Sequence, residues 1–442
     1  MKLLISLLVL CLTQVLFPQL PRIEYEEFRL DNGLRVILHQ DNTNPIVAIT
    51  VTYHTGSKNE HPERTGFAHF FEHLMFEGTP NIPRGKFMEI VQNAGGQLNA
   101  STSFDQTFYY LLFPSNRLEF GLYLESERLL QLKIDSLGVE TQRNVVKEER
   151  RQRYDNTPYG SMMEKLFAKA YTVHPYRWMP IGSIQYIDKA GIEEFIDFYQ
   201  HYYVPGNAIL SIAGDITIDE TKALIEKYFG EIPVGNQTIS RPTEIEPQQL
   251  TERRDTVYDN IKLPALIMGY HIPERTHKDM PALTILGQVL SSGQSSRLYT
   301  RLVDETRAAL SVSASPLQLE HPGLFLVSGY ANSGVALDSV ELLIEAEFDK
   351  IKNDLITDWE YEKSLNSMEN RFVSSRGTMM SIASSLASNA LYFNDPEMIN
   401  SGFALYQQVT KEDVKEVANK YLKRENRTIL YYLPKNQEGG KK

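Results

Sequence analysis

Cysteine is nearly absent from this chain. Its 442 residues include a single cysteine, Cys11, which lies close to the N-terminus. One cysteine cannot close an intrachain disulfide, so we expect none even in an oxidising compartment. The body of the chain therefore has no thiol that could act as a nucleophile or bind a metal. Any catalytic chemistry must come from other side chains.

Basic residues are too few to outnumber the acidic ones. The formal net charge is -11, from 45 lysines and arginines against 56 aspartates and glutamates. This balance gives no positive surface for a phosphate backbone, which argues against nucleic acid as a partner and leaves cationic peptides open. The chain is longer than the ~250–300 residues at which single cores stop growing, so we expect at least two domains.

Long hydrophobic runs are lacking except at the N-terminus. Residues 1–20, MKLLISLLVLCLTQVLFPQL, contain an apolar run from Leu3 to Leu12 that follows a lysine. This run is shorter than the ~20 residues that span a bilayer and fits the central region of a signal peptide. We therefore predict export, to the periplasm or another extracytoplasmic space, with removal of residues 1–20. The alternatives are a lipid on Cys11 and an uncleaved leader that holds the protein at a membrane.

The rest of the chain alternates between strand-like and helix-like segments. Alternating apolar residues flank a turn signal at Asp31-Asn32-Gly33 and predict two strands. The β-branched run IVAITVTY predicts a buried strand, residues 63–76 a helix, and GQLNASTSFDQTFYYLLFP a return to strands. Helical patterns follow over residues 116–132 and much of residues 141–171. The chain thus interleaves strands and helices with short connections.

Two parts of the chain resemble each other across a polar, proline-containing segment. Residues 235–254 predict an interdomain linker. Short matches recur across it at an offset of about 218 residues and indicate a duplicated domain. The matched residues are Tyr53-His54 with Tyr270-His271, Tyr202 with Tyr421, and Asn207 with Asn426. We predict an N-terminal domain over residues 22–234 and a homologous C-terminal domain over residues 255–436.

The stretch GFAHFFEHLMFEGT places His69, Glu72 and His73 in an otherwise apolar segment. Residues four apart on a helix share a face, so the two imidazoles can reach one ion. Imidazole at this spacing suits zinc, and the carboxylate of Glu72 can take a proton from zinc-bound water. The alternative is a pair of hydrogen-bonded histidines on a core helix. A third ligand is needed to decide between them.

The segment TQRNVVKEERRQRYDN offers that third ligand, because a catalytic zinc usually keeps three protein ligands and one open position. Glu148 and Glu149 follow an apolar pair, Val145-Val146, that can turn one carboxylate inward. The alternative is a solvated helix face, since KEERRQR is full of pairs three and four residues apart. The residues alone leave the choice between the two glutamates open.

The order H-x-x-E-H with a later glutamate in VVKEER resembles the pitrilysin/insulinase (M16) family of zinc metallopeptidases, in its small, processing-peptidase-like branch. Further segments are similar to that branch and extend the resemblance over residues 28–434. They are LDNGLRVIL, GGQLNASTSFDQTFYYLLFP, NTPYG, HPYRWMPIGS, YYVPGNAILSIAGDI and YFGEIP. The resemblance implies an α+β fold of two homologous α/β domains. Each has a mostly antiparallel sheet with helices on one side, and the two form a clam shell.

The same resemblance assigns the reactive residues. It implies that His69, His73 and Glu149 bind Zn²⁺ and that Glu72 is the general base. Glu149 is the member of the glutamate pair that matches the family pattern. Seven residues before it many relatives carry a glutamate that supports the site, whereas this chain has Gln142. A neutral amide there can hydrogen-bond a ligand but gives less negative charge to the metal.

The resemblance also implies where a peptide substrate binds. The strand GGQLNAST lies at a sheet edge in the family, and an extended peptide pairs with it. Asn99, Ala100 and Ser101 are then the substrate-binding residues. An edge strand offers unpaired backbone groups, which bind peptides with little regard to side chains.

A second departure from the family concerns the C-terminal half. Single-chain relatives carry an arginine and a tyrosine there that bind substrate and stabilise the oxyanion. Aligning SSRLYTRLVDETRAALSVSAS on that pattern puts Val303 and Leu310 at these positions, with Arg297 and Arg301 nearby as substitutes. Loss of oxyanion donors costs roughly 10²–10³ in rate. We therefore expect a zinc endopeptidase that is the catalytic subunit of a heterodimer, whose homologous M16 partner supplies the Arg/Tyr pair. The alternative is a non-proteolytic structural or peptide-binding subunit.

Overall fold

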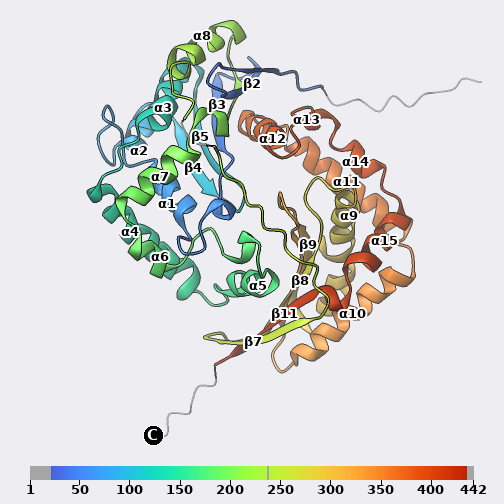
Figure 1. The fold of residues 1–442 in the computed structure, drawn as a ribbon. Coiled ribbons are helices and arrows are strands. Elements are labelled where there is room, and N and C mark those ends of the chain that lie inside the picture. Colours follow the sequence, from blue (N-terminus) through green and yellow to red (C-terminus); the bar gives the residue numbers. More distant parts are fainter. Residues whose placement is uncertain (1–20, 236–237, 436–442) are drawn as a thin grey trace, which may run out of the picture.

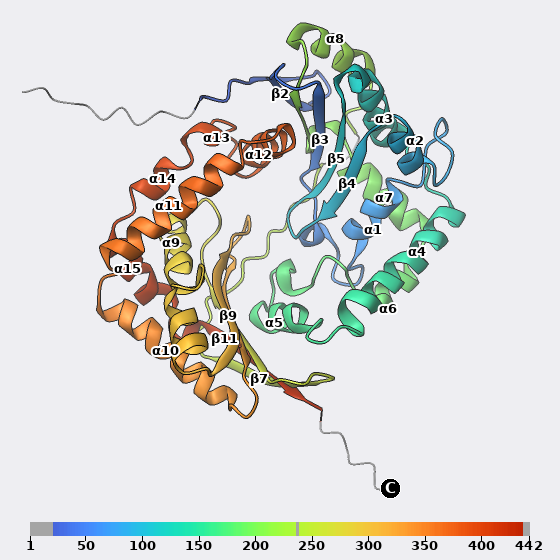
Figure 2. The same ribbon diagram turned by 180° about the vertical axis from the view of Figure 1, so that it is seen from behind.

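The computed structural model describes residues 21–235 and 238–435, so the predicted signal peptide lies outside the described residues. Two α/β halves lie side by side, each with a sheet and a layer of outer helices (Figure 1). Figure 2 shows the same two layers from behind. In the described part of the chain no helix is both long and apolar enough to cross a membrane.

The N-terminal half contains a six-stranded sheet in the order β1-β2-β6-β3-β5-β4. Its strands are β1 (Glu26–Arg29), β2 (Arg35–Gln40), β3 (Ile46–Tyr53), β4 (Gln97–Thr102), β5 (Thr107–Pro114) and β6 (Ala208–Gly214). Only β2 and β6 run parallel, and the other neighbours are antiparallel. This order leaves β4 at an edge of the sheet.

Most helices of this half cover one face of that sheet. The helices of this half are α1 (Phe67–Leu74), α2 (Phe87–Asn93), α3 (Leu118–Gln131), α4 (Ser136–Arg150), α5 (Met162–Ala170), α6 (Ile184–Lys189), α7 (Ile192–Tyr202) and α8 (Ile218–Phe229), of which α5 lies elsewhere. Alternate residues of β3, such as Val47 and Ile49, share a core with Phe70 and Phe71 of α1. Burial of this face fixes α1 against the sheet.

The C-terminal half has a five-stranded sheet in the order β7-β11-β8-β10-β9. Its strands are β7 (Arg253–Asp259), β8 (Ala265–His271), β9 (Ala309–Leu317), β10 (Leu324–Ala331) and β11 (Arg427–Pro434). Its helices are α9 (Met280–Ser291), α10 (Leu337–Asn353), α11 (Asp358–Ser374), α12 (Met379–Tyr392), α13 (Met398–Ser401), α14 (Ala404–Gln407) and α15 (Lys411–Tyr421). Here β7 and β11 form the parallel pair.

The two sheets repeat one plan, which confirms the duplication expected from the sequence. The order β2-β6-β3-β5-β4 in the first sheet corresponds to β7-β11-β8-β10-β9 in the second. The matched asparagines also form equivalent hydrogen bonds in the two halves. The Asn207 side-chain amide donates to the Tyr202 carbonyl at 2.8 Å, and that of Asn426 donates to the Tyr421 carbonyl at 2.9 Å.

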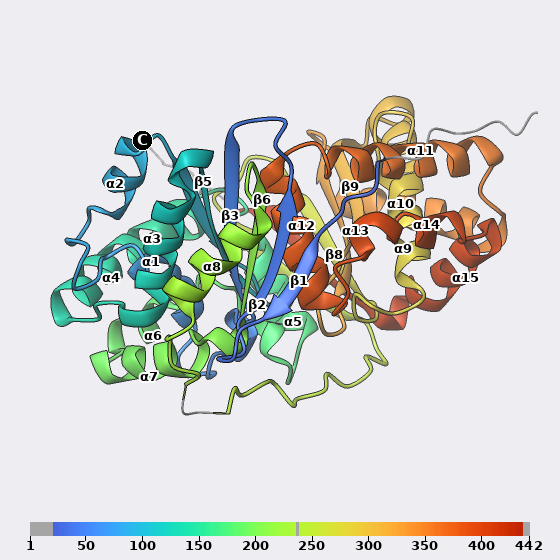
Figure 3. The same ribbon diagram turned by 90° about the horizontal axis from the view of Figure 1, so that it is seen from above.

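Each half also places one helix on the sheet of the other half. Helix α12 packs on β2, β3 and β6 through a cluster that includes Leu386 and Ala48 (Figure 3). Helix α5 packs on β8 and β11 through a cluster that includes Leu166 and Ile267. As predicted, the helices of each half form an outer layer on one side of its own sheet. The other side of each sheet is covered by a helix from the other half.

Two predicted boundaries differ from the structure. The helix expected over residues 63–76 begins only at Phe67. Gly66 has a left-handed φ of 99°, which a right-handed helix cannot include. The linker expected over residues 235–254 ends earlier, since Arg253 and Arg254 pair with β11 as the start of β7. The described residues between Phe229 and Arg253 form no helix or strand.

Candidate metal and active site

Three predicted ligands come together between α1 and α4. Glu149 Oε2 lies 3.7 Å from Nε2 of His69 and 3.2 Å from Nε2 of His73. The two imidazole rings are 4.9 Å apart between centroids and nearly perpendicular. The three ligand atoms lie within 4.8 Å of one another, and among the described residues no other such group of three was found.

The local sequence explains how α1 presents its histidines. Buried Glu60 accepts hydrogen bonds from the backbone N–H groups of Gly66 and Ala68, at 2.9 and 2.8 Å, which anchors the start of the helix. Phe70 and Phe71 are buried against the core on the opposite face. Because residues four apart share a helix face, both imidazoles turn toward α4.

Helix α4 distinguishes the two adjacent glutamates. Val146 is fully buried, whereas Val145 is exposed, so only one valine of the pair seats the helix. The Glu149 side chain is 17% exposed, whereas that of Glu148 is 54% exposed and pairs with Arg151 at the surface. The structure thus brings Glu149, and not Glu148, to the histidines.

The donor set fits zinc. Tetrahedral zinc with bonds of about 2.0–2.1 Å separates its ligand atoms by about 3.3 Å, close to both nitrogen–oxygen distances here. Burial, together with the neighbouring His73, lowers the pKa of His69 to about 4, so this ring is neutral and able to bind a metal at pH 7. The hydrogen bond with His73 lowers the pKa of Glu149, which keeps it ionised.

Gln142, where the family resemblance implies a glutamate, contacts one of the two histidines. Nδ1 of His73 donates to Oε1 of Gln142 at 3.2 Å, which leaves Nε2 directed at the metal position. The Gln142 amide in turn donates to Glu77 at 2.6 Å, and Glu77 pairs with Arg84 at 3.1 Å. Sequence reasoning missed Glu77, because only the fold brings this residue, four after His73, beneath α4.

Glu72 lies beside the three ligands and is held by a residue of the edge strand. The Thr102 hydroxyl donates to Oε2 of Glu72 at 2.7 Å. Burial raises the pKa of Glu72, while the hydrogen bond from Thr102 opposes that rise. A carboxylate with a raised pKa can both accept and return a proton near neutral pH. Thr102 was not predicted, since no local pattern marks it as a partner of Glu72.

The three predicted substrate-binding residues lie on β4, which among the described strands pairs only with β5. Asn99 and Ser101 are exposed, and Ala100 is half-buried on the face that packs against the helices. The Asn99 side chain accepts a hydrogen bond from the Ala100 N–H at 2.9 Å. The edge is therefore open to a peptide strand once this short contact is exchanged.

The C-terminal positions that would carry the Arg/Tyr pair hold no donors. Leu310 lies at the start of the edge strand β9 and is 53% exposed, and Val303 precedes it in a π-helical segment. The two nearby arginines are engaged within their own half. Arg297 binds Glu360 through two hydrogen bonds of 2.6 and 2.8 Å, and Arg301 pairs with Glu305 at 2.9 Å.

Comparison with known families agrees with this architecture. The family model described as Insulinase (Peptidase family M16) matches residues 35–178, and the one described as Peptidase M16 inactive domain matches residues 189–368. The chain belongs to the M16 peptidase family. Helix α9, the counterpart of α1, reads MPALTILGQVLS and contains neither histidine nor glutamate, in keeping with an inactive second domain.

The chain is also similar to individual proteins of known sequence or structure. The chain is 32% identical to the zinc protease PqqE of Helicobacter pylori over 93% of each chain, and 27% identical to the uncharacterized zinc protease YmxG of Bacillus subtilis over 78% of this chain and 82% of that one. The crystal structure of a protease from Helicobacter pylori superposes with a TM-score of 0.89 at 32% identity, covering 93% of this chain and all of that one. The first half of the periplasmic protease PqqL from Escherichia coli shares the fold, with a TM-score of 0.76 at 23% identity over 94% of this chain and 93% of that one.

Proposed function

We propose that this protein is a zinc-dependent endopeptidase that hydrolyses extended peptides or unfolded segments between its two halves. The observation that carries the proposal is the convergence of His69, His73 and Glu149, with Glu72 beside them. The relatives named as zinc proteases support it.

Each residue has a distinct role in this reaction. His69, His73 and Glu149 would hold Zn²⁺, which when bound supplies Lewis acidity that polarises a carbonyl and acidifies water. Glu72 accepts the proton of the attacking water and passes it to the leaving amine. Thr102 fixes the Glu72 carboxylate through its hydrogen bond. Gln142 orients His73.

The edge strand β4 supplies the substrate's backbone contacts. A peptide that pairs with β4 runs beside Thr102 and hence past Glu72. Main-chain hydrogen bonds give such a complex affinity without fixing the sequence of the peptide. Asn99, Ala100 and Ser101 then line the peptide along its length.

We further propose a heterodimer. Val303 and Leu310 cannot donate hydrogen bonds, and Arg297 and Arg301 are already paired with glutamates. A homologous M16 chain that carries an arginine and a tyrosine at these positions would complete the active centre. Export through the N-terminal leader, to the periplasm or another extracytoplasmic space, would require that the partner be exported as well.

Substitutions at three glutamates test the reaction. Glu72→Gln should keep the zinc content and lower peptide cleavage by about 10²–10⁴, the usual contribution of a general base. Glu149→Gln should lose zinc as well as activity. Glu148→Gln is the matched control and should retain both, because its side chain lies at the surface. Zinc-dependent cleavage that survives Glu72→Gln would overturn the mechanism.

The missing donors favour one other function. A subunit that keeps the fold but does not cleave peptides, and instead builds a complex or binds peptides, would not need the Arg/Tyr pair. Copurification of the native partner, followed by peptide cleavage assays on each chain and on the complex, separates the two functions. Activity that appears only in the complex supports the heterodimer. A complex that binds zinc and cleaves nothing supports the second function.

A further inference from the structure

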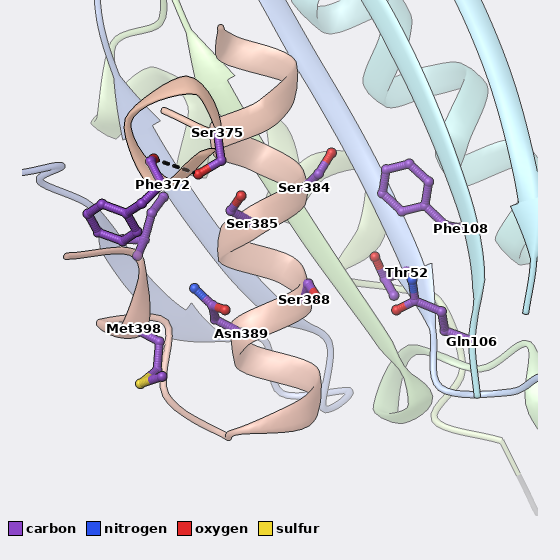
Figure 4. Close-up of a pocket in the computed structure, with 11 residues that line it drawn as sticks. Thr52, Gln106, Phe108, Phe372, Ser375, Ser384, Ser385, Ser388, Asn389 and Met398 are labelled. Carbon is purple, nitrogen blue, oxygen red and sulfur yellow. Dashed lines mark hydrogen bonds between the residues drawn. The ribbon is translucent and has the colours of Figure 1, made fainter. Parts of the chain in front are cut away.

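A groove crosses helix α12 between the two halves of the molecule (Figure 4). Its volume of about 410 Å³ falls within the range of about 300–1,000 Å³ that is typical of ligand sites. We call it the α12 groove. The residues that define it are Thr52 and Phe108 from the first sheet, Gln106 from the turn between β4 and β5, and Ser384, Ser385, Ser388 and Asn389 from α12.

Two polar atoms of the α12 groove have no partner. Thr52 is 1% exposed, and its hydroxyl forms no hydrogen bond with any described residue. The buried Oε1 atom of Gln106 is likewise unpartnered within the described chain. Figure 4 shows the Thr52 hydroxyl directed toward α12. Since nearly all buried polar groups in proteins are hydrogen-bonded, each of these two atoms can take a partner that a ligand supplies.

The lining of the groove defines the chemistry of that partner. Among the described residues no charged side chain lines it, and its polar groups are hydroxyls and amides. Phe108, Phe372 and Met398 add apolar surface. Oε1 of Gln106 can only accept a hydrogen bond, whereas the Thr52 hydroxyl can donate or accept. The groove therefore suits an uncharged ligand with both donors and acceptors, which is what the backbone of a peptide offers.

The strand register places the groove next to the candidate active site. Thr102, which holds Glu72, pairs with Thr107 across the β4–β5 hairpin. Phe108 follows Thr107 on β5, and side chains alternate between the two faces of a strand, while Gln106 lies in the turn just before β5. The end of one hairpin thus presents the Glu72 contact on one face and the α12 groove on the other.

We propose that the α12 groove is a second peptide-binding site, which takes an uncharged segment of the substrate through hydrogen bonds to its backbone. This inference rests on the proposed peptidase function. A peptide paired with β4 continues around the hairpin end into the groove. Because the groove is formed by strands of one half and by helix α12 of the other, the bound segment contacts both halves.

Peptide binding to the uncleaving Glu72→Gln protein tests the site. The probes are a fluorescent, uncharged, serine- and asparagine-rich peptide of about 20 residues, which spans about 66 Å when extended, and a fragment of about six residues that covers β4 alone. Thr52→Val and Gln106→Met, made in this background, each remove one hydrogen-bonding atom with little change in shape. Each should weaken binding of the long peptide about two- to tenfold and leave the short one unchanged.

The matched control is Thr221→Val in the same background. Thr221 is fully buried, and its hydroxyl also lacks a partner among the described residues, but it lies on α8 outside the groove. It should not change peptide affinity. Thermal midpoints provide a second readout, because Thr52→Val removes no internal hydrogen bond and should not lower the midpoint. Ser388→Tyr, which fills the groove, should weaken binding of the long peptide further.

The outcomes separate this site from the proposed function. Failure of the unmodified complex to cleave peptides overturns the peptidase function alone, since binding is measured without cleavage. Equal losses for long and short peptides, unchanged affinity in Thr52→Val and Gln106→Met, or no binding of the long peptide by the parent protein would each overturn the groove as a peptide site.

Discussion

Lys58 in the N-terminal half and Glu320 in the C-terminal half form an ion pair across the interface between the halves. The Lys58 side chain is completely buried and also pairs with Asp105 at 3.0 Å. Glu320 accepts a further hydrogen bond from Nε2 of His54 at 2.7 Å. Burial opposes ionisation of Glu320, but His54 and the charge of Lys58 outweigh it and lower its pKa to about 2.

Removal of the buried cation should destabilise the protein strongly. Lys58→Met leaves Asp105 and Glu320 without their shared partner, and breaking a buried pair in this way costs about 3–5 kcal/mol. Glu320→Gln should cost less, because Asp105 still neutralises Lys58. Urea unfolding of both variants measures the difference. A smaller loss for Lys58→Met than for Glu320→Gln would contradict this assignment.

Acid should destabilise the fold through His174. Burial, with His321 close by, lowers the pKa of His174 to about 4. Between about pH 6.5 and pH 4, His174 is therefore protonated in the unfolded state but mostly neutral in the folded state. The free energy of unfolding falls as the pH drops through this range. In His174→Asn this slope should be shallower, whatever the variant's stability at pH 7.5. Thermal midpoints measured across this range give the slope, and the exposed His61→Asn should leave it unchanged.

Gln142 should control zinc affinity. Loss of a group that orients a metal-binding histidine typically costs 10–100-fold in affinity, so Gln142→Ala should weaken zinc binding by about this factor. Gln142→Glu should not restore the family pattern, because its carboxylate would lie against Glu77, which now accepts the Gln142 amide. Competition titration with a zinc indicator measures both. Asn144→Ala, an exposed amide on the same helix, is the control.

Zinc removal should lower the stability of the wild-type protein. A ligand that binds only the folded state at 1,000 times its dissociation constant contributes about 4.1 kcal/mol. Dialysis against a chelator should therefore lower the thermal midpoint, and added zinc should restore it. Glu149→Gln should show a much smaller response. A midpoint that zinc does not affect in either protein would contradict the metal site.

The Ala100 N–H should matter to peptide cleavage more than to folding. This group donates to the Asn99 side chain rather than to a neighbouring strand. Ala100→Pro removes it at an edge position, where proline is tolerated, and should lower kcat/KM about tenfold with little change in the unfolding midpoint. Asn99→Ala, which frees the same amide, separates the backbone contribution from that of the side chain. An unchanged kcat/KM in Ala100→Pro would argue against strand pairing at β4.

Much of the fold followed from local patterns. The turn around Gly33, the strands on both sides of it and the duplication all agree with the structure, because alternation and turn chemistry are encoded within short windows. The predicted start of α1 was wrong by four residues. The spacing of apolar residues does not reveal that Gly66 has a left-handed φ, which a helix cannot contain. The exchange of α5 and α12 was not predicted, because it depends on contacts distant in sequence.

In the site, too, local sequence patterns predicted some residues, while others became visible only in the fold. The histidine spacing named His69 and His73, and the family resemblance, rather than the residues alone, selected Glu149; the structure brings these three together. Glu77 and Thr102 were missed because each reaches the site from another element, through contacts that no spacing rule records. Their roles, like those of the ligands, stay predictions until the variants are measured.

The exchange of α5 and α12 bears on how the chain tolerates cleavage. Each helix is joined to its own half by the chain but buries its apolar face on the sheet of the other half. Cleavage of the backbone between Phe229 and Arg253 would therefore leave two fragments that remain bound to each other through these two helices. Two separately expressed halves should reassemble into one particle, and the intact chain should unfold in one cooperative step rather than domain by domain.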